Sequence, residues 1–306
     1  MTILSRAGVR NGLGLPEEGG PFYFLRGLCQ ESYGKEADMG YLQWKIDRVA
    51  ARGKGLVKLG DTRYTVHEPI KLRSGIQIVG KGNRATHIYC DHDVPAFTTD
   101  SADGQIYDVT LSHLWITREG LTGPILELEN VHHSLIQNCI IERSSGVGDI
   151  DHGSTIGIEF IGPAYHNVLL HVQVRYAETG IQFIQSGADT GQANSVFGGA
   201  VKNCTRGIVI NQCKGNNLSG IAIQDCSSKG IEFLGAQYNN VSGCFLEVKH
   251  LSGEVPPTCV SFDSGSTNNT ITGCVTFLSG PNSTASSPAY EKYDPGEPDY
   301  GSNTVI

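Results

Sequence analysis

The sequence predicts an all-β protein built as a right-handed parallel β-helix, a solenoid, with an N-terminal capping α-helix. Three observations predict this fold. A Gly-led apolar strand recurs along the chain, an Asn-led strand follows it each time, and a tight corner with a small residue or Cys then leads into a third short strand. One such unit is too short to bury its own apolar face, so successive units must stack on one another.

The Gly-led strands define the period of the repeat. They begin at Gly157, Gly180, Gly207 and Gly230, and Cys259 continues the series. Their first inward residues are Ile158, Ile181, Ile208, Ile231 and Val260, which are separated by 23, 27, 23 and 29 residues. Three short strands in such a period form one coil of a β-helix. Leucine-rich repeats share the period, but the Leu-x-x-Leu-x-Leu phrase and a helix in each repeat are missing.

The Asn-led strands keep the same spacing. They begin at Asn167, Asn194, Asn217, Asn240 and Asn269. Side-chain amides at repeated corners can form a ladder between stacked coils. The segment Asn303–Ile306 has the same pattern, so we expect one more strand there, paired with the last coil or with a neighbouring chain.

Two stretches lie outside the repeat. Residues 36–52 place Leu42, Ile46 and Val49 at helical spacing, which predicts an amphipathic helix that covers the open end of the solenoid. The predicted organisation is an N-terminal arm or attachment segment over 1–35, the capping helix and β-helix over 36–279, and a Pro/Ser-rich C-terminal arm over 280–306.

Composition excludes several classes of protein. The chain carries 23 Lys and Arg against 31 Asp and Glu, a net charge of -8, so no basic stripe is available for nucleic acid. Its apolar runs are far shorter than the ~20 residues of a membrane span, and its start lacks the apolar stretch of a secretory signal peptide. The nine Cys follow no metal spacing and recur at equivalent corners, so we expect small buried hydrophobic residues.

The segment from Gly55 to Gly82 carries a recognisable phrase, Gly-Leu-Val-Lys-Leu-Gly-Asp-Thr-Arg-Tyr followed by Ile-Lys-Leu-Arg-Ser-Gly-Ile-Gln-Ile-Val-Gly-Lys-Gly. It resembles the opening of the pectate-lyase-like β-helix superfamily, particularly bacteriophage tailspikes, with Asp61 and Arg63 as departures near the bend. The resemblance implies a carbohydrate-directed protein that is often a homotrimer, located in the virion. It also implies attachment to other tail proteins through the N-terminal arm. The fold supports many chemistries, so activity must be argued from a site.

Alternation along the Gly-led strands separates inward from outward side chains. The predicted outer column contains Tyr89 with His87, Glu127, Glu159, Gln182, Val209, Glu232 and Ser261, and Ile125 is expected outside as well. Glu127 and Glu159 would lie one coil apart, at about 4.8 Å, which is close to the carboxyl separation of retaining glycosidases. Two solvated surface glutamates, or a Ca²⁺ or Mg²⁺ site between them, are the alternatives.

Two long turns flank this column. The turn from Glu142 to Ser154 contains Asp149, Asp151 and His152, and the turn from Gln185 to Gln192 contains Asp189. Insertions in repeat proteins concentrate on the functional face, and acids with a histidine suit general acid–base catalysis. An ordinary polar loop is the alternative for each turn. The predicted catalytic residues are Glu159, Glu127, Asp151 and Asp149, and the predicted substrate-binding residues are His152, Tyr89, Gln182, Asp189, Arg175 and Glu232.

Two functions follow from these residues taken together with the resemblance. The first is a phage tailspike-like depolymerase that binds a capsule, lipopolysaccharide or exopolysaccharide and hydrolyses it with paired carboxylates. Hydrolysis is preferred over β-elimination because no basic cluster lies on the predicted column. The second is a non-catalytic structural or receptor-binding component of a virion. His132, His133, His166 and His171 show no metal-ligand spacing, so we expect no metal and no cofactor.

Overall fold

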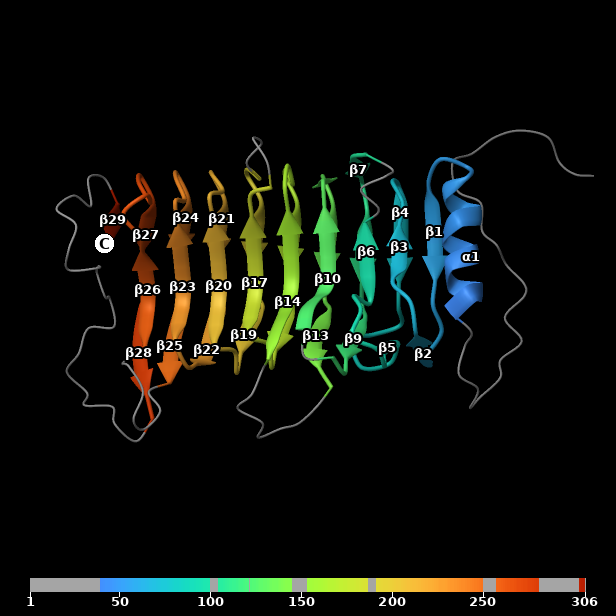
Figure 1. Cartoon of the computed structure of the whole chain (residues 1–306), viewed down its shortest axis with the longest axis horizontal. Helices are drawn as coiled ribbons and strands as arrows, with labels where there is room; N and C mark the ends of the chain where they lie inside the picture. Colours follow the sequence, from blue (N-terminus) through green and yellow to red (C-terminus); the bar gives the residue numbers. More distant parts are fainter. Residues whose placement is uncertain are drawn as a thin grey trace, which may run out of the picture. The chain divides into compact units, whose positions relative to one another are not determined.

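The computed structural model describes residues 39–99, 104–120, 122–144, 153–186, 191–249, 257–280 and 303–305. The predicted N-terminal arm, 1–35, lies outside these residues, as does most of the predicted C-terminal arm. The described chain is a right-handed parallel β-helix with one helix, α1 (Met39–Ala50), beside its first coil (Figure 1). The predicted fold class is confirmed.

Each coil contributes one strand to each of three parallel sheets. Sheet I contains the predicted Gly-led strands together with the strands that pair beside them: β3 (Ile70–Leu72), β6 (Phe97–Thr99), β10 (Thr122–Glu129), β14 (Ser154–Ile161), β17 (Thr179–Ile184), β20 (Arg206–Asn211), β23 (Lys229–Leu234) and β26 (Thr258–Phe262). Sheet II contains β1 (Gly55–Lys58), β4 (Ile76–Val79), β8 (Thr110–Ser112), β12 (Leu135–Gln137), β15 (Val168–Leu170), β18 (Ser195–Phe197), β21 (Asn217–Ser219), β24 (Asn240–Ser242), β27 (Thr270–Thr272) and β29 (Thr304–Val305).

Sheet III contains β2 (Arg63–Val66), β5 (His87–Cys90), β9 (Trp115–Arg118), β13 (Ile140–Arg143), β16 (Gln173–Arg175), β19 (Ala200–Lys202), β22 (Ala222–Cys226), β25 (Phe245–Lys249) and β28 (Val275–Ser279). A short pair, β7 (Ile106–Tyr107) and β11 (Val131–His132), lies at the corner between sheets I and II. The strand predicted over 303–306 is present as β29, which pairs with β27.

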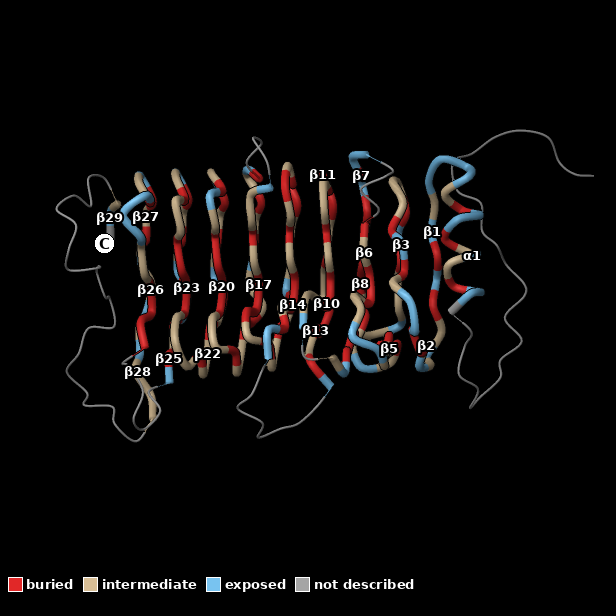
Figure 2. Tube along the Cα trace, viewed as in Figure 1, coloured by how far each residue is buried: buried red, intermediate tan, exposed pale blue. Residues whose placement is uncertain are grey.

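The inward-pointing side chains of sheet I form the buried row that the sequence predicts. Ile158 pairs with Ile181, and Ile208, Ile231 and Val260 continue the same row, each at most 1% exposed. Figure 2 shows the alternation of buried and more exposed residues along the strands. The predicted outward position of Ile125 is wrong, because it is fully buried at the bend where sheet III leads into sheet I.

The same bend explains the glycine in β14, β17, β20 and β23, the strands of sheet I that carry Gly157, Gly180, Gly207 and Gly230. A Cβ atom on Gly180 would lie 2.3 Å from Cγ1 of Val201 and 2.6 Å from the carbonyl oxygen of Gly207. No side chain fits at this distance, because close-packed interiors cannot absorb a further methyl group there. The repeated glycine is therefore a requirement of close approach between coils.

A buried asparagine ladder joins the coils at the start of sheet II. The side-chain amide of each Asn donates to Oδ1 of the next, at 2.9 Å for Asn167–Asn194, 3.1 Å for Asn194–Asn216, 2.9 Å for Asn216–Asn239, 2.8 Å for Asn239–Asn269 and 2.9 Å for Asn269–Asn303. The predicted ladder is confirmed, although Asn216 and Asn239 form it instead of Asn217 and Asn240. It satisfies polar groups that would otherwise be buried without partners.

The cysteines behave as small buried residues, as predicted. The eight within the described residues are all free thiols, and seven of them are buried. At the corners the Sγ atom approaches the carbonyl two residues earlier, at 3.3 Å in Cys139 and 3.4 Å in Cys204. Burial raises the pKa of both thiols to about 12, so they are unreactive at neutral pH.

The helix α1 covers the first coil, as predicted. Its residues Leu42, Ile46 and Val49 are buried in the same core as the strands. The side-chain amide of Gln43 also bonds the open edge of sheet I. Its Oε1 accepts from the Lys71 N–H at 2.8 Å, and its Nε2 donates to the Lys71 carbonyl at 3.2 Å. No helix among the described residues is long and apolar enough to span a bilayer.

Candidate functional site

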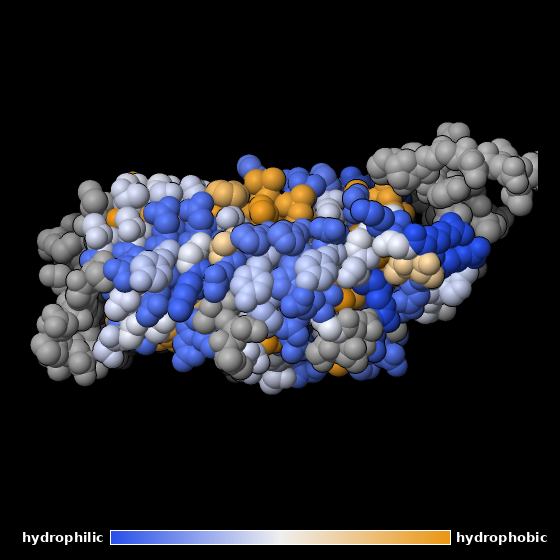
Figure 3. Space-filling view, turned by 90° about the horizontal axis from the view of Figure 1, so that it is seen from above, coloured by the Kyte–Doolittle hydropathy of each residue, from blue (hydrophilic) through white to orange (hydrophobic). Residues whose placement is uncertain are grey.

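The outward column of sheet I brings the predicted glutamates together. Glu127 on β10 pairs in register with Glu159 on β14, and Glu159 pairs with Gln182 on β17. Neighbouring parallel strands lie about 4.8 Å apart, so the two carboxyl groups project side by side from adjacent coils. In the opposite direction the column continues through Thr98 to Lys71. Figure 3 shows the molecule from above the view of Figure 1, and the described residues on that side are mostly hydrophilic.

Both glutamates hold carboxyl groups that resist ionisation. Burial raises the pKa of Glu159, and the charge of Glu127 raises it further. Burial also raises the pKa of Glu127, with a second contribution from Glu129. Among the described residues, no Lys or Arg forms an ion pair with either carboxyl group. Burial and the neighbouring charge therefore favour the protonated form of each carboxyl group more than in an isolated glutamate.

The far end of the column differs from the prediction. Val209 was expected to face solvent, but it is only 2% exposed. Glu232 is 6% exposed and bonds the ammonium of Lys229, while its Oε2 accepts from Nη1 of Arg206 at 3.4 Å. A carboxylate held by two cations is a structural group, because its charge is already compensated. The predicted role of Glu232 in substrate binding therefore has less support than the roles of Glu127 and Glu159.

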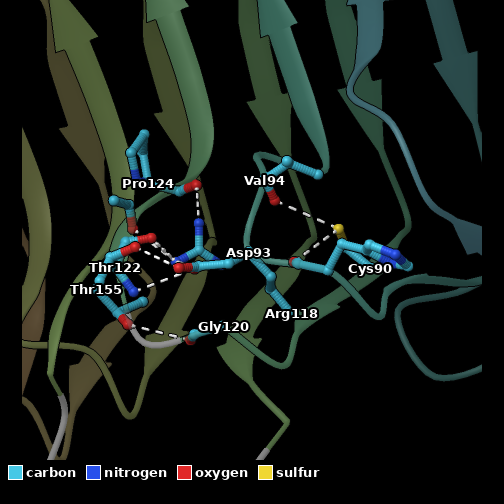
Figure 4. Close-up of polar contacts among 10 residues, drawn as sticks. Cys90, Asp93, Val94, Arg118, Gly120, Thr122, Pro124 and Thr155 are labelled. Atoms are coloured by element: carbon cyan, nitrogen blue, oxygen red, sulfur yellow. Dashed lines mark hydrogen bonds and ion pairs between the residues drawn. The ribbon is translucent and has the colours of Figure 1, made fainter.

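A buried arginine positions the strand that carries Glu127 (Figure 4). Arg118, 1% exposed, donates through Nη1 to the Pro124 carbonyl at 2.7 Å and through Nη2 to the carbonyls of Thr122 and Gly123, the latter at 3.0 Å. Its Nη2 also lies 3.3 Å from Oδ1 of Asp93. A buried charge with this many acceptors holds the chain in one conformation, so the start of β10 is well defined.

A hollow of about 500 Å³ lies at the α1 end of the column. It is lined by Gly40, Gln43, Trp44, Asp47, Arg48, Glu68, Pro69 and Lys71. The indole of Trp44 is half exposed, and the guanidinium of Arg48 lies 5.0 Å from its ring centroid. The helical spacing predicted only a cap here. The exposed Trp44 within an otherwise amphipathic pattern was the available signal.

Two predicted substrate-binding residues lie on another face. Tyr89 is on β5 and Arg175 is on β16, so both belong to the outward face of sheet III. The predicted placement of Tyr89 in the column of Glu127 is therefore wrong. Its strand pairs with β2 and β9, and the coil position beside Glu127 is occupied by Thr98. Alternation identifies the outward side of a strand, but it does not say which of the three sheets the strand joins.

Sheet III carries an aromatic and charged cluster around Tyr89. The imidazole of His87 stacks on the indole of Trp115, with ring centroids 4.1 Å apart and planes inclined by 16°. The guanidinium of Arg63 lies 3.6 Å from the ring centroid of Tyr89, whose hydroxyl bonds Glu119. That bond is the main cause of the raised pKa of Tyr89. Burial, followed by the charge of Arg63, lowers the pKa of His87 to about 4, so this imidazole is neutral at pH 7.

Glu142 connects this cluster to Arg175. Its Oε1 accepts from the Trp115 indole N–H at 2.8 Å, and its Oε2 lies 3.8 Å from Nη1 of Arg175. Glu142 was predicted to begin a long turn, whereas it belongs to β13. The role of Trp115 was missed as well, although Trp115 precedes the inward Ile116 on its strand. We refer to Arg63, His87, Tyr89, Trp115, Glu142 and Arg175 as the sheet III cluster.

The remaining predicted site residues lie outside the described part of the chain. Asp149, Asp151 and His152 fall within 145–152, and Asp189 falls within 187–190. The first of these turns leads into β14, which carries Glu159, and the second follows β17, which carries Gln182. Their contributions stay predictions.

The four histidines considered as metal ligands do not converge in the described structure. The ring of His132 stacks between Tyr107 and Tyr165, with centroids 4.9 and 5.1 Å away, and His133 stacks on His166 at 5.2 Å. No described carboxylate joins these rings. Burial lowers the pKa of His132, with smaller contributions from His133 and His166, so it stays neutral inside the corner.

The sequence matches no protein-family model and no curated protein. Among solved structures, the chain superposes on ORF18 of Geobacillus virus E2 with a TM-score of 0.54 at 13% identity, covering 78% of this chain and 55% of the viral protein. The A-module of mannuronan C-5 epimerase AlgE6 from Azotobacter vinelandii superposes with a TM-score of 0.51 at 14% identity, covering 89% of this chain and 94% of the module.

DFA-IIIase from Arthrobacter chlorophenolicus, solved in complex with GF2, superposes with a TM-score of 0.54 at 12% identity, covering 80% of this chain and 77% of that enzyme. At these identities the likeness is one of fold. The chain spans about half the length of the viral protein. These superpositions thus confirm the predicted parallel β-helix fold.

Proposed function

We propose that this protein binds a polysaccharide along the outward face of sheet I and hydrolyses it with Glu159 and Glu127. The observation that carries the proposal is the pairing of Glu127 with Glu159 in adjacent coils, where both carboxyl groups have raised pKa values and no described cation neutralises them. Such a pair is costly to maintain for structure alone, because like charges directly opposite one another destabilise a sheet.

In the proposed mechanism Glu159 is the acid and Glu127 the nucleophile. Glu159 donates its proton to the glycosidic oxygen while the bond from that oxygen to the anomeric carbon breaks, and the carboxylate of Glu127 bonds to the anomeric carbon. Glu159, now ionised, then takes a proton from water, and that water displaces Glu127. The strand spacing of about 4.8 Å suits this retaining route, since an inverting route needs room for water between the carboxyl groups.

The turns that flank the pair supply further predicted roles. Asp149 and Asp151 lie in the segment leading into the Glu159 strand, where either is an alternative base for water. His152, Gln182 and Asp189 are proposed to contact the sugar beside the pair. The hollow at Trp44 and Lys71, reached along the same column through Thr98, offers a half-exposed indole of the kind that contacts sugar rings.

The biological setting belongs to this proposal as well. One protein of similar fold is a viral ORF product, and another is named for an activity on mannuronan. These names support a phage tail protein, in the virion, that acts on a capsule, lipopolysaccharide or exopolysaccharide of the host. A homotrimer, with attachment to other tail proteins through the N-terminal arm, completes the proposal.

The test of catalysis compares Glu159→Gln with the unaltered protein on a panel of bacterial surface glycans. We expect new reducing ends from the unaltered protein, without unsaturated products, and a loss of at least 100-fold in rate for Glu159→Gln. The matched control is Glu247→Gln, an outward glutamate on sheet III whose strand lies away from the pair, and it should keep full activity. Full activity in Glu159→Gln would remove this residue from the mechanism.

A second candidate function, glycan binding without cleavage, is favoured by the sheet III cluster. His87 stacked on Trp115 provides a flat ring surface, and Arg63, Glu142 and Arg175 provide hydrogen-bonding groups around it. Aromatic faces bordered by such groups suit sugar rings. If Trp115→Ala abolishes glycan binding while Glu159→Gln leaves it unchanged, and no glycan is cleaved, this second function holds.

A further inference from the structure

A compact cluster of His67, Asp91 and His92 lies on the surface near the α1 end of the solenoid. His67 follows β2 directly, and Asp91 and His92 follow β5. Because Val66 pairs with Cys90, the two strand ends are adjacent, and the residues after them meet although they are 24 positions apart in the chain. This cluster has no part in the proposed hydrolysis.

Three ligand atoms converge in this cluster. Nδ1 of His67 lies 2.8 Å from Oδ1 of Asp91, and Nδ1 of His92 lies 2.5 Å from the same oxygen. The two rings approach at a steep angle, 79°, with centroids 5.4 Å apart. The potential donor atoms of the three residues all lie within 4.8 Å of one another. Rings that approach one carboxylate from different directions can surround an ion, unlike the parallel rings of His133 and His166.

We propose that His67, Asp91 and His92 form a binding site for a divalent transition-metal ion, with Zn²⁺ as the best match. Imidazole nitrogen and carboxylate oxygen are Zn²⁺ ligands at roughly 2.0–2.2 Å, and three protein ligands leave a fourth position for water. Binding requires neutral histidines, and the ion would replace the hydrogen bonds that now join the rings to Asp91. Among the described residues, no Lys or Arg pairs with Asp91 to compete with the ion.

The chain that carries Asp91 and His92 is held in place from both sides. The Sγ of Cys90 bonds the carbonyls of His92 and Val94, at 3.4 and 3.3 Å. Beyond His92, the carboxylate of Asp93 accepts from the N–H of Thr122 at 3.2 Å and from its hydroxyl. Figure 4 shows Asp93 beside Arg118 and Cys90 beside Val94. These contacts fix the backbone while leaving the histidine side chains more than half exposed, so an ion can reach them.

The site joins the first two strands of sheet III, so a bound ion would cross-link neighbouring coils. A metal ion that binds only the folded chain stabilises that chain, and the stabilisation grows as more of the sites are occupied. We therefore expect Zn²⁺ to raise the unfolding temperature of the protein and to have no effect on a variant that lacks the ligands.

The test is calorimetric titration of ZnCl₂ into the full-length protein after removal of metals with a chelator. We expect one ion per chain, and at least ~10-fold weaker binding in the double variant His67→Asn, His92→Asn. The control is His171→Asn, an exposed histidine far along the solenoid, which should bind as the unaltered protein does. Titration with Co²⁺ should give the visible bands of a tetrahedral ion, and the double variant should lose them. Equal Zn²⁺ binding by all three proteins, or no binding by the unaltered protein, would overturn the proposal.

Discussion

The paired glutamates make a prediction about stability that is independent of any substrate. Glu159 is half-buried beside Glu127, and both carboxyl groups have pKa values above the ordinary range. Replacing Glu159 by Gln keeps the shape of the side chain and removes one charge. We expect Glu159→Gln to be more stable than the unaltered protein at pH 8, even though it is proposed to be inactive.

The magnitude follows from the strand pairing. Like charges directly opposite one another in a sheet cost ~0.2–1 kcal/mol, and removing a partly buried charge adds to the effect. We therefore expect Glu159→Gln to gain about 1 kcal/mol in the free energy of unfolding. The pH dependence has a definite sign. A carboxyl group whose pKa is raised by folding keeps its proton to a higher pH in the native state than in the unfolded chain. The destabilisation by its charge is therefore absent well below the unfolded pKa of ~4.3 and complete above the folded pKa. The gain should therefore grow as pH rises from acidic to neutral.

The assay is urea unfolding followed by circular dichroism at several pH values, with Glu232→Gln as the matched control. Glu232 lies in the same column and is buried, but it pairs with Lys229 and Arg206. Its replacement should lower the free energy of unfolding by about 1–3 kcal/mol at pH 8, the opposite sign. If Glu159→Gln is destabilised as much as Glu232→Gln, the two glutamates are not a repelling pair and the reasoning fails.

Three further predictions concern the solenoid and its surface. Asn216→Ala removes an acceptor for two buried N–H groups of the ladder, so it should lower the free energy of unfolding in urea by ~2–4 kcal/mol. The adjacent Asn217 is half-buried, and Asn217→Ala should cost less than ~1 kcal/mol. Gly180→Ala should prevent folding or lower the unfolding temperature sharply, because its methyl group would meet backbone at 2.6 Å. Gly243 has open space around it but a φ of +58°, so Gly243→Ala should cost only the ~1–2 kcal/mol of a left-handed alanine. Trp115→Ala should weaken glycan binding measurably in calorimetry only if the sheet III cluster contacts the sugar.

The inward pattern could be predicted from the sequence because each coil repeats the same constraint. Ile158 and its equivalents must pack on one another, and the glycine before them must allow the coils to approach, so the period and the Glu127–Glu159 pairing follow together. The strand Asn303–Ile306 was predicted for the same reason. Burial of Ile125 was missed because the bend into sheet I places two consecutive residues inward, which interrupts the alternation.

The other faces could not be predicted in the same way. Alternation gives the side of a strand, but membership of a sheet depends on the number of residues in each turn, and these vary between coils. Tyr89 was therefore assigned to the wrong face. The meeting of His67 with Asp91 depends on the register of β2 with β5, which no local spacing reveals. The cations that hold Glu232 likewise come from its own strand and its neighbour.

The chemical step proposed for the outward face of sheet I is tested most directly by the stereochemistry of cleavage. A surface glycan that the protein degrades should be followed by nuclear magnetic resonance as the first products form. A retaining pair at the strand spacing predicts that the new sugar end initially keeps the anomeric configuration of the bond that was cut. Initial products of inverted configuration, or products with an unsaturated ring, would contradict catalysis by Glu127 and Glu159 acting as nucleophile and acid.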